Sequence, residues 1–405
     1  MTIRLFEDTR IILGVSGSIA AYKAADLASR LTQAGADVDA ILTESALNFV
    51  APLTFQSVTG RRAYVDADLW GSEAHVLHVG LARRASLIVV APATANTIAK
   101  LAHGQADNLL TILALASDCP LMVAPAMDAG MFSHLATQEN LETLRRRGVT
   151  ITGPVSGHLA SGLEGPGRMV EPEELLGTIR LTLGRNGGMA GRSVVVTAGG
   201  THEAIDPVRV IANRSSGKQG YALAQAALDR GARVTLVSGP VSLPTPVGAC
   251  RVDVTTAAEM TDAVLTAVEG ADALLMAAAV ADFRPSQAAE RKMRRGAVAP
   301  SITLEATEDI LGKVMTQRKK SGHPSVVVGF AAESHDLIES ARTKLRSKGL
   351  SLIVANDILS QDSGFASDDN RVTLLDADDT VQQLALMSKA AVADVVIDRV
   401  ERMLG

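Results

Sequence analysis

A turn rich in glycine and hydroxyl groups follows the first apolar run of the chain. In the segment GVSGSIAAYK, Ser16, Gly17 and Ser18 stand where a predicted strand ends and a predicted helix begins. Small residues, hydroxyls and free backbone N–H groups at such a position can bind a phosphate. An ordinary strand-to-helix turn has the same composition, so this segment alone leaves phosphate binding open.

Three later segments of the first half also carry polar side chains directly after apolar runs. Because the carboxyl ends of parallel strands meet at one edge of a sheet, we expect these side chains to lie together with Gly17. The segments concerned are LTESA, APATANTIAKLAHGQADNLL and PAMDAGMF.

The second half contains a different phosphate-binding pattern. The segment TAGGTHEAIDPVRVIANRSSGKQG turns through Gly199 and Gly200 and ends in Asn-Arg-Ser-Ser-Gly-Lys at a predicted helix start. Its N–H groups, hydroxyls and Lys218 ammonium group could hold a triphosphate. The spacing fits neither G-x-x-x-x-G-K-[ST] nor G-x-G-x-x-G, which disfavours a Walker ATPase and a plain NAD dehydrogenase.

Basic side chains follow other strand ends of the second half. Arg291, Lys292, Arg294 and Arg295 form a basic run after AAAVADFRP, and Lys344 and Lys348 lie about one helical turn apart. Each group alone could be a solvated surface. Several clusters at strand ends, in a chain whose remaining surface is not unusually basic, indicate convergence on phosphates.

The composition fits two α/β domains. The 405 residues exceed what one hydrophobic core supports, and 47% apolar with 3% aromatic residues suits parallel strands under alanine-rich helices. A formal charge of -5 gives no general footprint for nucleic acid or membrane, so neither partner is expected. The apolar stretches are too short to span a bilayer, and we expect a cytoplasmic protein.

Apolar runs alternate with amphipathic segments along both halves. Such alternation predicts parallel sheets with right-handed crossovers and helices on both faces. We expect one domain over residues 1–185, a second, Rossmann-like domain over 192–405, and a flexible glycine-rich linker at 186–191. Near the end, NRVTLLDADDTVQQL alternates apolar and polar residues around a polar turn and predicts a small antiparallel hairpin.

Residues 8–180 resemble the FMN-dependent cysteine decarboxylase family, which has a flavodoxin-like, doubly wound parallel sheet. The resemblance rests on the four segments above, on HVGLA and on GPVSGHLASGLEGPGRM. It implies that His78 is the catalytic base and that Asp128 and Met131 bind the substrate. The FMN contacts that it implies are Ser16, Gly17, Ser18, Thr43, Ser45, Thr94, Asn96 and Thr97.

Two positions depart from that family's pattern. Asp128 replaces an asparagine that contacts the substrate carboxylate, and an ionised Asp128 would repel that group. Ser161 replaces the cysteine that donates the final proton, and an aliphatic hydroxyl gives up its proton far less readily than a thiol. The domain could be a decarboxylase that draws this proton from water, another side chain or a relay through Ser161. It could instead be a flavin-binding scaffold.

Residues 190–400 resemble phosphopantothenate–cysteine ligase through the ordered motifs TAGGT, DPVR, NRSSGKQG, AAAVADFRP, GFAAE and VAND. In this family CTP converts phosphopantothenate into an acyl-cytidylate, and the amine of cysteine then displaces CMP. The resemblance implies that Asn213 acts on the acyl-cytidylate, that Lys292 neutralises charge, and that Mg²⁺ bridges the phosphates. The implied CTP contacts are Gly200, Ser215, Ser216, Gly217, Lys218, Asp282, Lys292, Glu308, Asp309, Ile310, Leu311, Phe330, Lys344 and Lys348.

The two resemblances together predict a bifunctional enzyme of coenzyme A biosynthesis. Its small-molecule partners would be 4'-phosphopantothenate, cysteine, CTP and phosphopantothenoylcysteine, the last being both ligase product and decarboxylase substrate. A homo-oligomer is implied as well, with trimers of the first domain joined through dimers of the second, up to a dodecamer. The alternatives are an active ligase beside an inactive flavin scaffold, and an NAD-dependent oxidoreductase.

Overall fold

The computed structural model describes residues 5–70, 74–294, 301–333, 336–357 and 367–405. The chain forms two compact units, the first ending at Leu183 and the second beginning at Gly184. Residues 186–191, for which we expected a flexible linker, pack on the second unit, because Met189 is fully buried and its N–H donates to the Arg230 carbonyl at 2.9 Å. No helix in the described ranges is long and apolar enough to cross a membrane.

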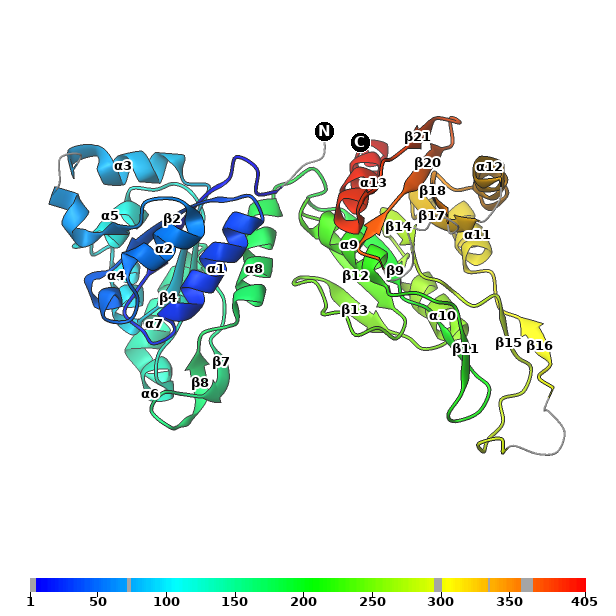
Figure 1. Ribbon diagram of the computed structural model, residues 1–405, viewed down its shortest axis with the longest axis horizontal. Helices are drawn as coiled ribbons and strands as arrows, with labels where there is room; N and C mark the ends of the chain where they lie inside the picture. The colour runs from blue at the N-terminus through cyan, green and yellow to red at the C-terminus, as the bar shows by residue number, and fades with distance from the viewer. Residues whose placement is uncertain (1–4, 71–73, 295–300, 334–335, 358–366) are drawn as a thin grey trace. The chain divides into compact units, whose positions relative to one another are not determined.

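The first unit is built on a six-stranded parallel sheet with helices on both faces (Figure 1). Its strand order is β3-β2-β1-β4-β5-β6. Apart from the short edge strand β3, this is the flavodoxin-like order, so the predicted doubly wound sheet is confirmed. The strands are β1 (Arg10–Val15), β2 (Asp37–Leu42), β3 (Tyr64–Val65), β4 (Leu87–Ala93), β5 (Leu121–Pro125) and β6 (Thr150–Ile151).

Successive residues of β1 supply the two faces of this core. Ile11 and Leu13 join the cluster that contains Leu27 of α1, whereas Ile12 joins the opposite cluster with Leu110 of α5. Such alternation is typical of a strand that is buried on both sides. The helical segments are α1 (Ala21–Gln33), η1 (Glu44–Asn48), α2 (Pro52–Thr59), η2 (Asp66–Trp70), α3 (Ala74–Arg84), α4 (Ala95–His103), α5 (Leu109–Leu115), α6 (Ala129–Ser133), α7 (Leu135–Arg146) and α8 (Pro172–Gly184).

An antiparallel hairpin lies beside the carboxyl end of β5. It consists of β7 (Val155–His158) and β8 (Glu164–Arg168). The Met127 N–H donates to the Gly167 carbonyl at 3.0 Å, and a Cβ on Gly167 would stand only 2.2 Å from the Met127 carbonyl oxygen. Glycine is therefore required for this close approach, which fixes the hairpin over the turn between β5 and α6.

The second unit contains an eight-stranded sheet of order β13-β12-β9-β14-β17-β18-β20-β21. The first six strands are parallel in the 3-2-1-4-5-6 order of a Rossmann fold. The last two run antiparallel, which confirms the predicted hairpin. The strands are β9 (Ser193–Ala198), β12 (Arg233–Ser238), β13 (Cys250–Asp253), β14 (Ala273–Met276), β17 (Val326–Glu333), β18 (Leu352–Asp357), β20 (Val372–Asp376) and β21 (Val381–Gln383).

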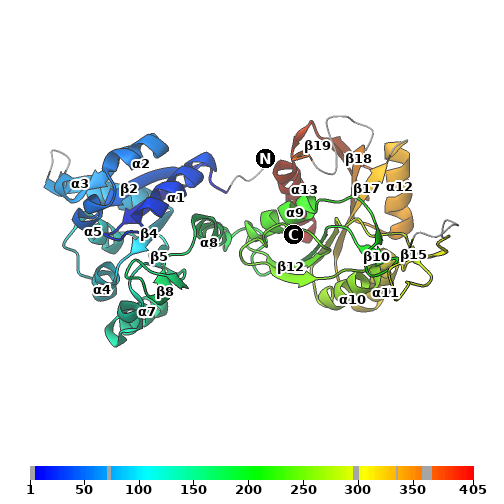
Figure 2. The same cartoon turned by 60° about the horizontal axis from the view of Figure 1, so that its bottom comes forward.

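Helices cover both faces of this sheet. Figure 2 shows α9 and α13 on one face and α10 and α11 on the other. The main helices are α9 (Lys218–Leu228), α10 (Ala257–Ala267), α11 (Ile310–Ser321), α12 (Leu337–Lys348) and α13 (Lys389–Leu404). Three two-stranded ribbons complete the unit: β10 (His202–Ala204) with β11 (Val210–Ala212), β15 (Phe283–Pro285) with β16 (Leu304–Ala306), and β19 (Asp369–Asn370) with β22 (Met387–Ser388).

A buried guanidinium group joins α13 to the end of α9. Arg230 is 2% exposed, and its Nη atoms lie 3.1 Å from Asp394 and 2.6 Å from Asp398 of α13. A buried charge is stable only when it is paired, so the two aspartates fix the helix pair in register.

Candidate active sites

The first unit has a cavity of about 570 Å³ at the carboxyl ends of β1, β4 and β5. It is bounded by the turn after β1, the start of α4, the turn before α6 and the β7–β8 hairpin. Six of the residues predicted to act here line it together: Gly17, Ser18, Thr94, Asp128, Met131 and Ser161. The structure thus brings both unusual positions, Asp128 and Ser161, into one cavity with part of the predicted flavin site.

Gly17 allows two turns to meet at the edge of this cavity. A Cβ at this position would lie 2.5 Å from the Cβ of Ser45. Ser16 ties the same turn to α4, because its hydroxyl donates to the Pro92 carbonyl at 2.7 Å and accepts from the Thr94 N–H at 3.0 Å. Ser16 is buried and its hydroxyl is engaged within the protein, so in this structure it positions the turn.

Several other predicted FMN contacts lie near the cavity without lining it. The Thr94 side chain accepts from the Thr97 N–H and caps α4, while Asn96 is exposed. Within the described residues, Thr43 Oγ1 is buried and has no hydrogen-bond partner. An unpaired buried hydroxyl beside a turn that excludes side chains fits a bound group that carries phosphate and hydroxyls, as FMN does.

Asp128 and Ser161 are hydrogen-bonded to each other. The Ser161 hydroxyl donates to Asp128 Oδ2 at 2.6 Å, and the Gly130 N–H donates to Asp128 Oδ1 at 2.9 Å. These bonds, led by the one from Ser161, hold the pKa of Asp128 below its ordinary value. Asp128 is therefore an ionised carboxylate at neutral pH in this structure.

His78 lies outside the residues that line the cavity. It is part of α3, and its Nδ1 is buried without a hydrogen-bond partner among the described residues. The family resemblance implied that His78 is the catalytic base, but α3 precedes β4 and does not begin at a strand end of this site. The structure of one chain thus brings Asp128 and Ser161 together and leaves His78 apart.

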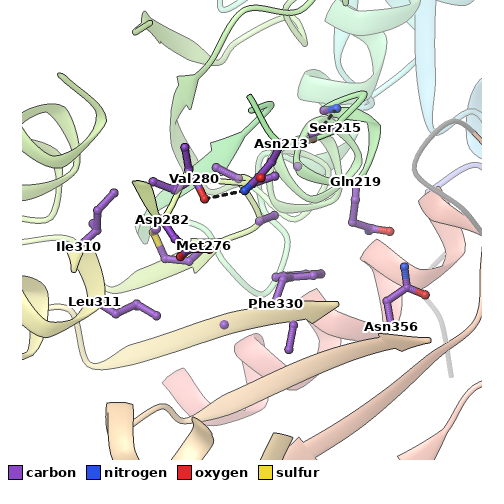
Figure 3. Close-up of a pocket in the computed structure, with 18 of the residues that line it drawn as sticks. Asn213, Ser215, Gln219, Met276, Val280, Asp282, Ile310, Leu311, Phe330 and Asn356 are labelled. Carbon is purple, nitrogen blue, oxygen red and sulfur yellow. Dashed lines mark hydrogen bonds between the residues drawn. The ribbon is translucent and has the colours of Figure 1, made fainter. Parts of the chain in front are cut away.

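The second unit has a cavity of about 810 Å³ above β14 and β17 (Figure 3). All the predicted CTP contacts line it except Gly200 and Lys292, and Asn213 lines it as well. Figure 3 shows Asn213 and Ser215 on one side and Ile310, Leu311 and Phe330 on the other. The lining also contains residues that sequence reasoning did not single out, although the quoted motifs VAND and GKQG held two of them: Gln219, Asn356, Asn370 and Lys389.

Hydrogen bonds between two loops shape this cavity. The Asn213 Nδ2 donates to the Val280 carbonyl at 2.8 Å, as the dashed line in Figure 3 shows. The Ala281 N–H donates to Thr201 Oγ1 at 2.9 Å, and the Ala279 N–H donates to the Gly199 carbonyl at 2.8 Å. The TAGGT and AAAVADF motifs therefore support each other, and Gly200 lies behind the lining.

Gly217 begins α9 with a left-handed backbone. Its φ is 75°, and a Cβ here would stand 2.9 Å from a methyl group of Val241. Glycine alone adopts this conformation without strain. The first residues of α9 thereby line the cavity, where backbone N–H groups at a helix start can bind an anion.

Acidic side chains pair with two of the lysines at the edge of this cavity. Lys348 is hydrogen-bonded to Asp309, and Lys218 lies 2.6 Å from Asp368. Although partial burial acts to raise it, the hydrogen bond and charge of Lys348 hold the pKa of Asp309 below its ordinary value. These ammonium groups can exchange a carboxylate for a phosphate, which binds more tightly where several cations converge.

Lys292 is exposed on a segment that Asp206 fixes in place. The buried Asp206 carboxylate accepts from the Met293 N–H at 3.1 Å, and Arg209 Nη2 donates to the Met293 carbonyl at 2.8 Å. Hydrogen bonds from Arg209, and then from backbone N–H groups, hold the pKa of Asp206 far below its ordinary value. The sequence alone assigned no role to Asp206 or Arg209, although an Asp-Pro pair, as in DPVR, often begins a turn.

Comparison with known proteins followed the same division of the chain. Residues 4–184 match the family model described as Flavoprotein, and residues 189–404 match the one described as DNA/pantothenate metabolism flavoprotein C-terminal domain.

Three curated relatives match the chain over nearly its whole length, and each carries the name coenzyme A biosynthesis bifunctional protein CoaBC. The protein from Vibrio vulnificus is 45% identical over 400 residues, 98% of both chains. That from Bacillus subtilis is 43% identical over 98% of this chain and 97% of its own, and that from Mycobacterium tuberculosis is 44% identical over 96% of each. With such matches over both units, the chain belongs to the family of bifunctional coenzyme A biosynthesis proteins.

Proposed function

We propose that the two cavities catalyse successive reactions, ligation of cysteine to 4'-phosphopantothenate with CTP and FMN-dependent decarboxylation of the product. The activities follow from the family; the assignment of residues to steps is our proposal. The observation that carries the ligase assignment is the convergence of Asn213, the start of α9, Lys344 and Lys348 on one cavity. We place both reactions in the cytoplasm.

In the ligase, the carboxylate of phosphopantothenate attacks the α-phosphorus of CTP and pyrophosphate leaves. The N–H groups after Gly217 and the ammonium groups of Lys344 and Lys348 would hold the phosphates, and Mg²⁺ would supply further neutralisation of their charge. Asn213 orients the acyl-cytidylate, and Lys292 stabilises the charge that develops as it forms. The amine of cysteine then displaces CMP.

Release of pyrophosphate tests the ligase directly. We expect release to require phosphopantothenate and to prefer CTP over ATP. Asn213→Ala should lower the rate by about 10²–10³-fold, as is usual when a donor to a reacting group is removed. Equal use of ATP and CTP would contradict the cytidylate assignment.

In the decarboxylase, the substrate thiol and carboxylate lie in the cavity that contains Asp128 and Ser161. Gly17, Ser18, Thr94 and the unpaired Thr43 hydroxyl would hold FMN beside it. FMN bound there would supply the reversible two-electron oxidation of the thiol-bearing carbon that allows the neighbouring carboxylate to leave. Met131, which is half exposed in this cavity, would exclude water from the substrate.

A homo-oligomer would complete this site. His78 lies apart from the cavity of its own chain, so in a trimer of the first unit it would serve the cavity of a neighbouring protomer. Large apolar side chains are exposed on this unit, as at interfaces between subunits: Ile19, Tyr22, Leu53 and Trp70. Dimers of the second unit would join such trimers, giving up to a dodecamer, and native mass spectrometry would measure the stoichiometry.

Anaerobic mixing with phosphopantothenoylcysteine tests the decarboxylase. We expect rapid loss of the oxidised-flavin absorbance together with release of carbon dioxide. Flavin binding without either signal would leave the first unit as a flavin-binding scaffold.

A further inference from the structure

Asp128 and Ser161 meet because the fold brings two separate segments together. Asp128 caps α6 after β5, and Ser161 lies in the turn of the β7–β8 hairpin. The Met127 N–H bond to the Gly167 carbonyl and the close packing of Gly167 hold that hairpin in place. Their 2.6 Å hydrogen bond is therefore supported on both sides by backbone contacts.

The two side chains can do together what neither does alone. A serine hydroxyl does not release its proton at neutral pH, because its conjugate base is too unstable, whereas a carboxylic acid releases one readily. A bond of 2.6 Å between Ser161 and Asp128 lies in the range of charge-assisted hydrogen bonds, along which a proton moves easily. If Asp128 carries a proton, it can donate to Ser161, whose own proton is then free for a third group.

We propose that Asp128 and Ser161 form a proton relay to the substrate carbon that loses carbon dioxide. The inference rests on the proposed decarboxylase function, which brings a substrate carboxylate into this cavity. Asp128 takes up a proton from solvent when that carboxylate binds beside it. After carbon dioxide has left, Ser161 passes a proton to the carbon and receives the one on Asp128.

Atoms and electrons balance in this sequence. The bond between carbon and carboxylate breaks, and its electron pair stays on the substrate as an enethiolate. A C–H bond forms with the proton of the Ser161 hydroxyl while the Asp128 proton moves to Ser161 Oγ. Ser161 ends neutral and Asp128 ends as a carboxylate, ready for the next cycle. The relay moves no electrons, so the exchange with FMN is unchanged.

Proton uptake follows from the charges around Asp128. Without substrate, the hydrogen bonds from Ser161 and Gly130 hold the pKa of Asp128 below its ordinary value, so the group is ionised at neutral pH. A second carboxylate in contact raises it, because two adjacent negative charges cannot both be kept. Substrate binding thus places on Asp128 the proton that the relay later delivers.

Other titratable groups share the cavity with Asp128. Tyr22, Lys23, His158 and Arg168 also line it. The Lys23 ammonium lies 2.9 Å from Glu171 and the Arg168 guanidinium lies 2.7 Å from the same carboxylate, so both cations are already paired. If the Lys23 or Arg168 cation left Glu171 and paired with the substrate carboxylate, Asp128 would take up no proton. Binding without proton uptake would therefore identify this competing arrangement.

Calorimetry measures the uptake without catalysis. The FMN-loaded full-length protein is titrated at pH 7 with phosphopantothenoylserine, in which a hydroxyl replaces the reactive thiol, in buffers of different ionisation enthalpy. We expect about one proton taken up per bound analogue, as for two carboxylates that share a site. Asp128→Asn should abolish uptake, and Ser161→Ala should retain it. Wild-type binding without uptake, or uptake unchanged in Asp128→Asn, would overturn the relay.

Measuring Asp128→Asn both in the wild type and in Ser161→Cys distinguishes a proton relay from a purely structural role of Asp128. With phosphopantothenoylcysteine, Ser161→Ala should still bleach the flavin and release carbon dioxide but should slow the return of flavin absorbance by about 10²-fold or more, as for loss of a general acid. Asp128→Asn should slow this return when Ser161 is present, yet have little effect when combined with Ser161→Cys, since a thiol supplies its own proton.

Ser156→Ala, at an exposed position in the same hairpin, should behave as wild type and controls for damage to the hairpin. An equal effect of Asp128→Asn in both backgrounds would overturn the relay. Absence of bleaching and carbon dioxide in the wild type would instead defeat the proposed function itself, so the two failures are distinguishable.

Discussion

The two cavities differ in how many of their predicted residues one chain brings together. In the second unit, residues from several strands and from the start of α9 converge, and nearly all the predicted nucleotide contacts line one cavity. In the first unit, the cavity collects Gly17, Thr94, Asp128 and Ser161, while His78 lies elsewhere on α3. Residues at strand ends thus come together within one chain, whereas His78 on the peripheral helix α3 would reach a cavity only in the homo-oligomer that we propose.

Loss of His78 is expected to give the largest difference between the decarboxylase and ligase rates. His78→Ala should lower decarboxylation by about 10²–10⁴-fold, the range for a general base, and leave pyrophosphate release by the ligase unchanged. Steady-state assays of both activities on one preparation make the measurement.

Co-expression shows whether the site is shared. If His78 serves a neighbouring protomer, mixed oligomers of His78→Ala and Ser161→Ala chains contain sites with both wild-type residues, and product formation should return. No recovery from purified mixed oligomers would contradict a site built from two chains.

The next largest effect is expected from Gly217→Ala, which alters the cavity of the second unit. Gly217→Ala places a Cβ 2.9 Å from Val241 at a φ of 75°, and left-handed backbone costs about 1–2 kcal/mol for a residue with a side chain. We expect affinity for CTP to fall by about ten- to a hundredfold, because the N–H groups of α9 move. Equilibrium dialysis with CTP measures this.

Gly270→Ala is the matched control. Gly270 has a φ of 73°, but a Cβ there meets nothing within 4 Å. Both variants carry similar backbone strain, so thermal stability should fall in both. Only the Cβ of Gly217→Ala pushes against Val241, so CTP affinity should fall only in that variant. Equal loss of affinity would show that strain, not displacement, is responsible.

Asp206→Asn tests whether the ligase depends on a residue outside its cavity. The change keeps the shape of the side chain but removes the charge that fixes Arg209 and the Met293 backbone. We expect kcat of the ligase to fall by about tenfold with little change in KM for CTP, because Lys292 is misplaced while the cavity is intact. Asp253→Asn, which loses a pair with Arg251 on β13, should change neither constant.

Lys348→Gln should have the smallest effect. Lys348 contacts Asp309 at the edge of the cavity, so KM for CTP should rise by a few-fold, and added salt should reduce the difference. The lowered pKa of Asp309 keeps its carboxylate charged down to acid pH, and the ion pair is lost only as pH falls below the ordinary carboxyl range. CTP affinity should therefore show no inflection from Asp309 between about pH 6 and 8. Arg346→Gln, which removes a partner of Asp379 from the same helix, is the control, because neither of these two residues lines the cavity.

Local patterns predicted those parts of the molecule that depend on short stretches of chain. Alternating apolar runs located both sheets, and the turn in NRVTLLDADDTVQQL located the β20–β21 hairpin. The Asp128 and Ser161 contact could not be predicted, because it depends on the path of the β7–β8 hairpin across the sheet edge. Met189 likewise looks like linker sequence but is buried, since its glycine neighbours let the chain approach the Arg230 backbone.

The order of synthesis gives the Arg230 contact a further meaning. The ribosome makes α9, whose first residues line the second cavity, long before it makes Asp394 and Asp398 on α13. Until then the Arg230 guanidinium must stay hydrated, because burial without those partners is strongly unfavourable. The second cavity, which Lys389 of α13 also lines, is thus completed only when α13 emerges, whereas the first unit has all of its strands much earlier and can fold while the second is still being translated.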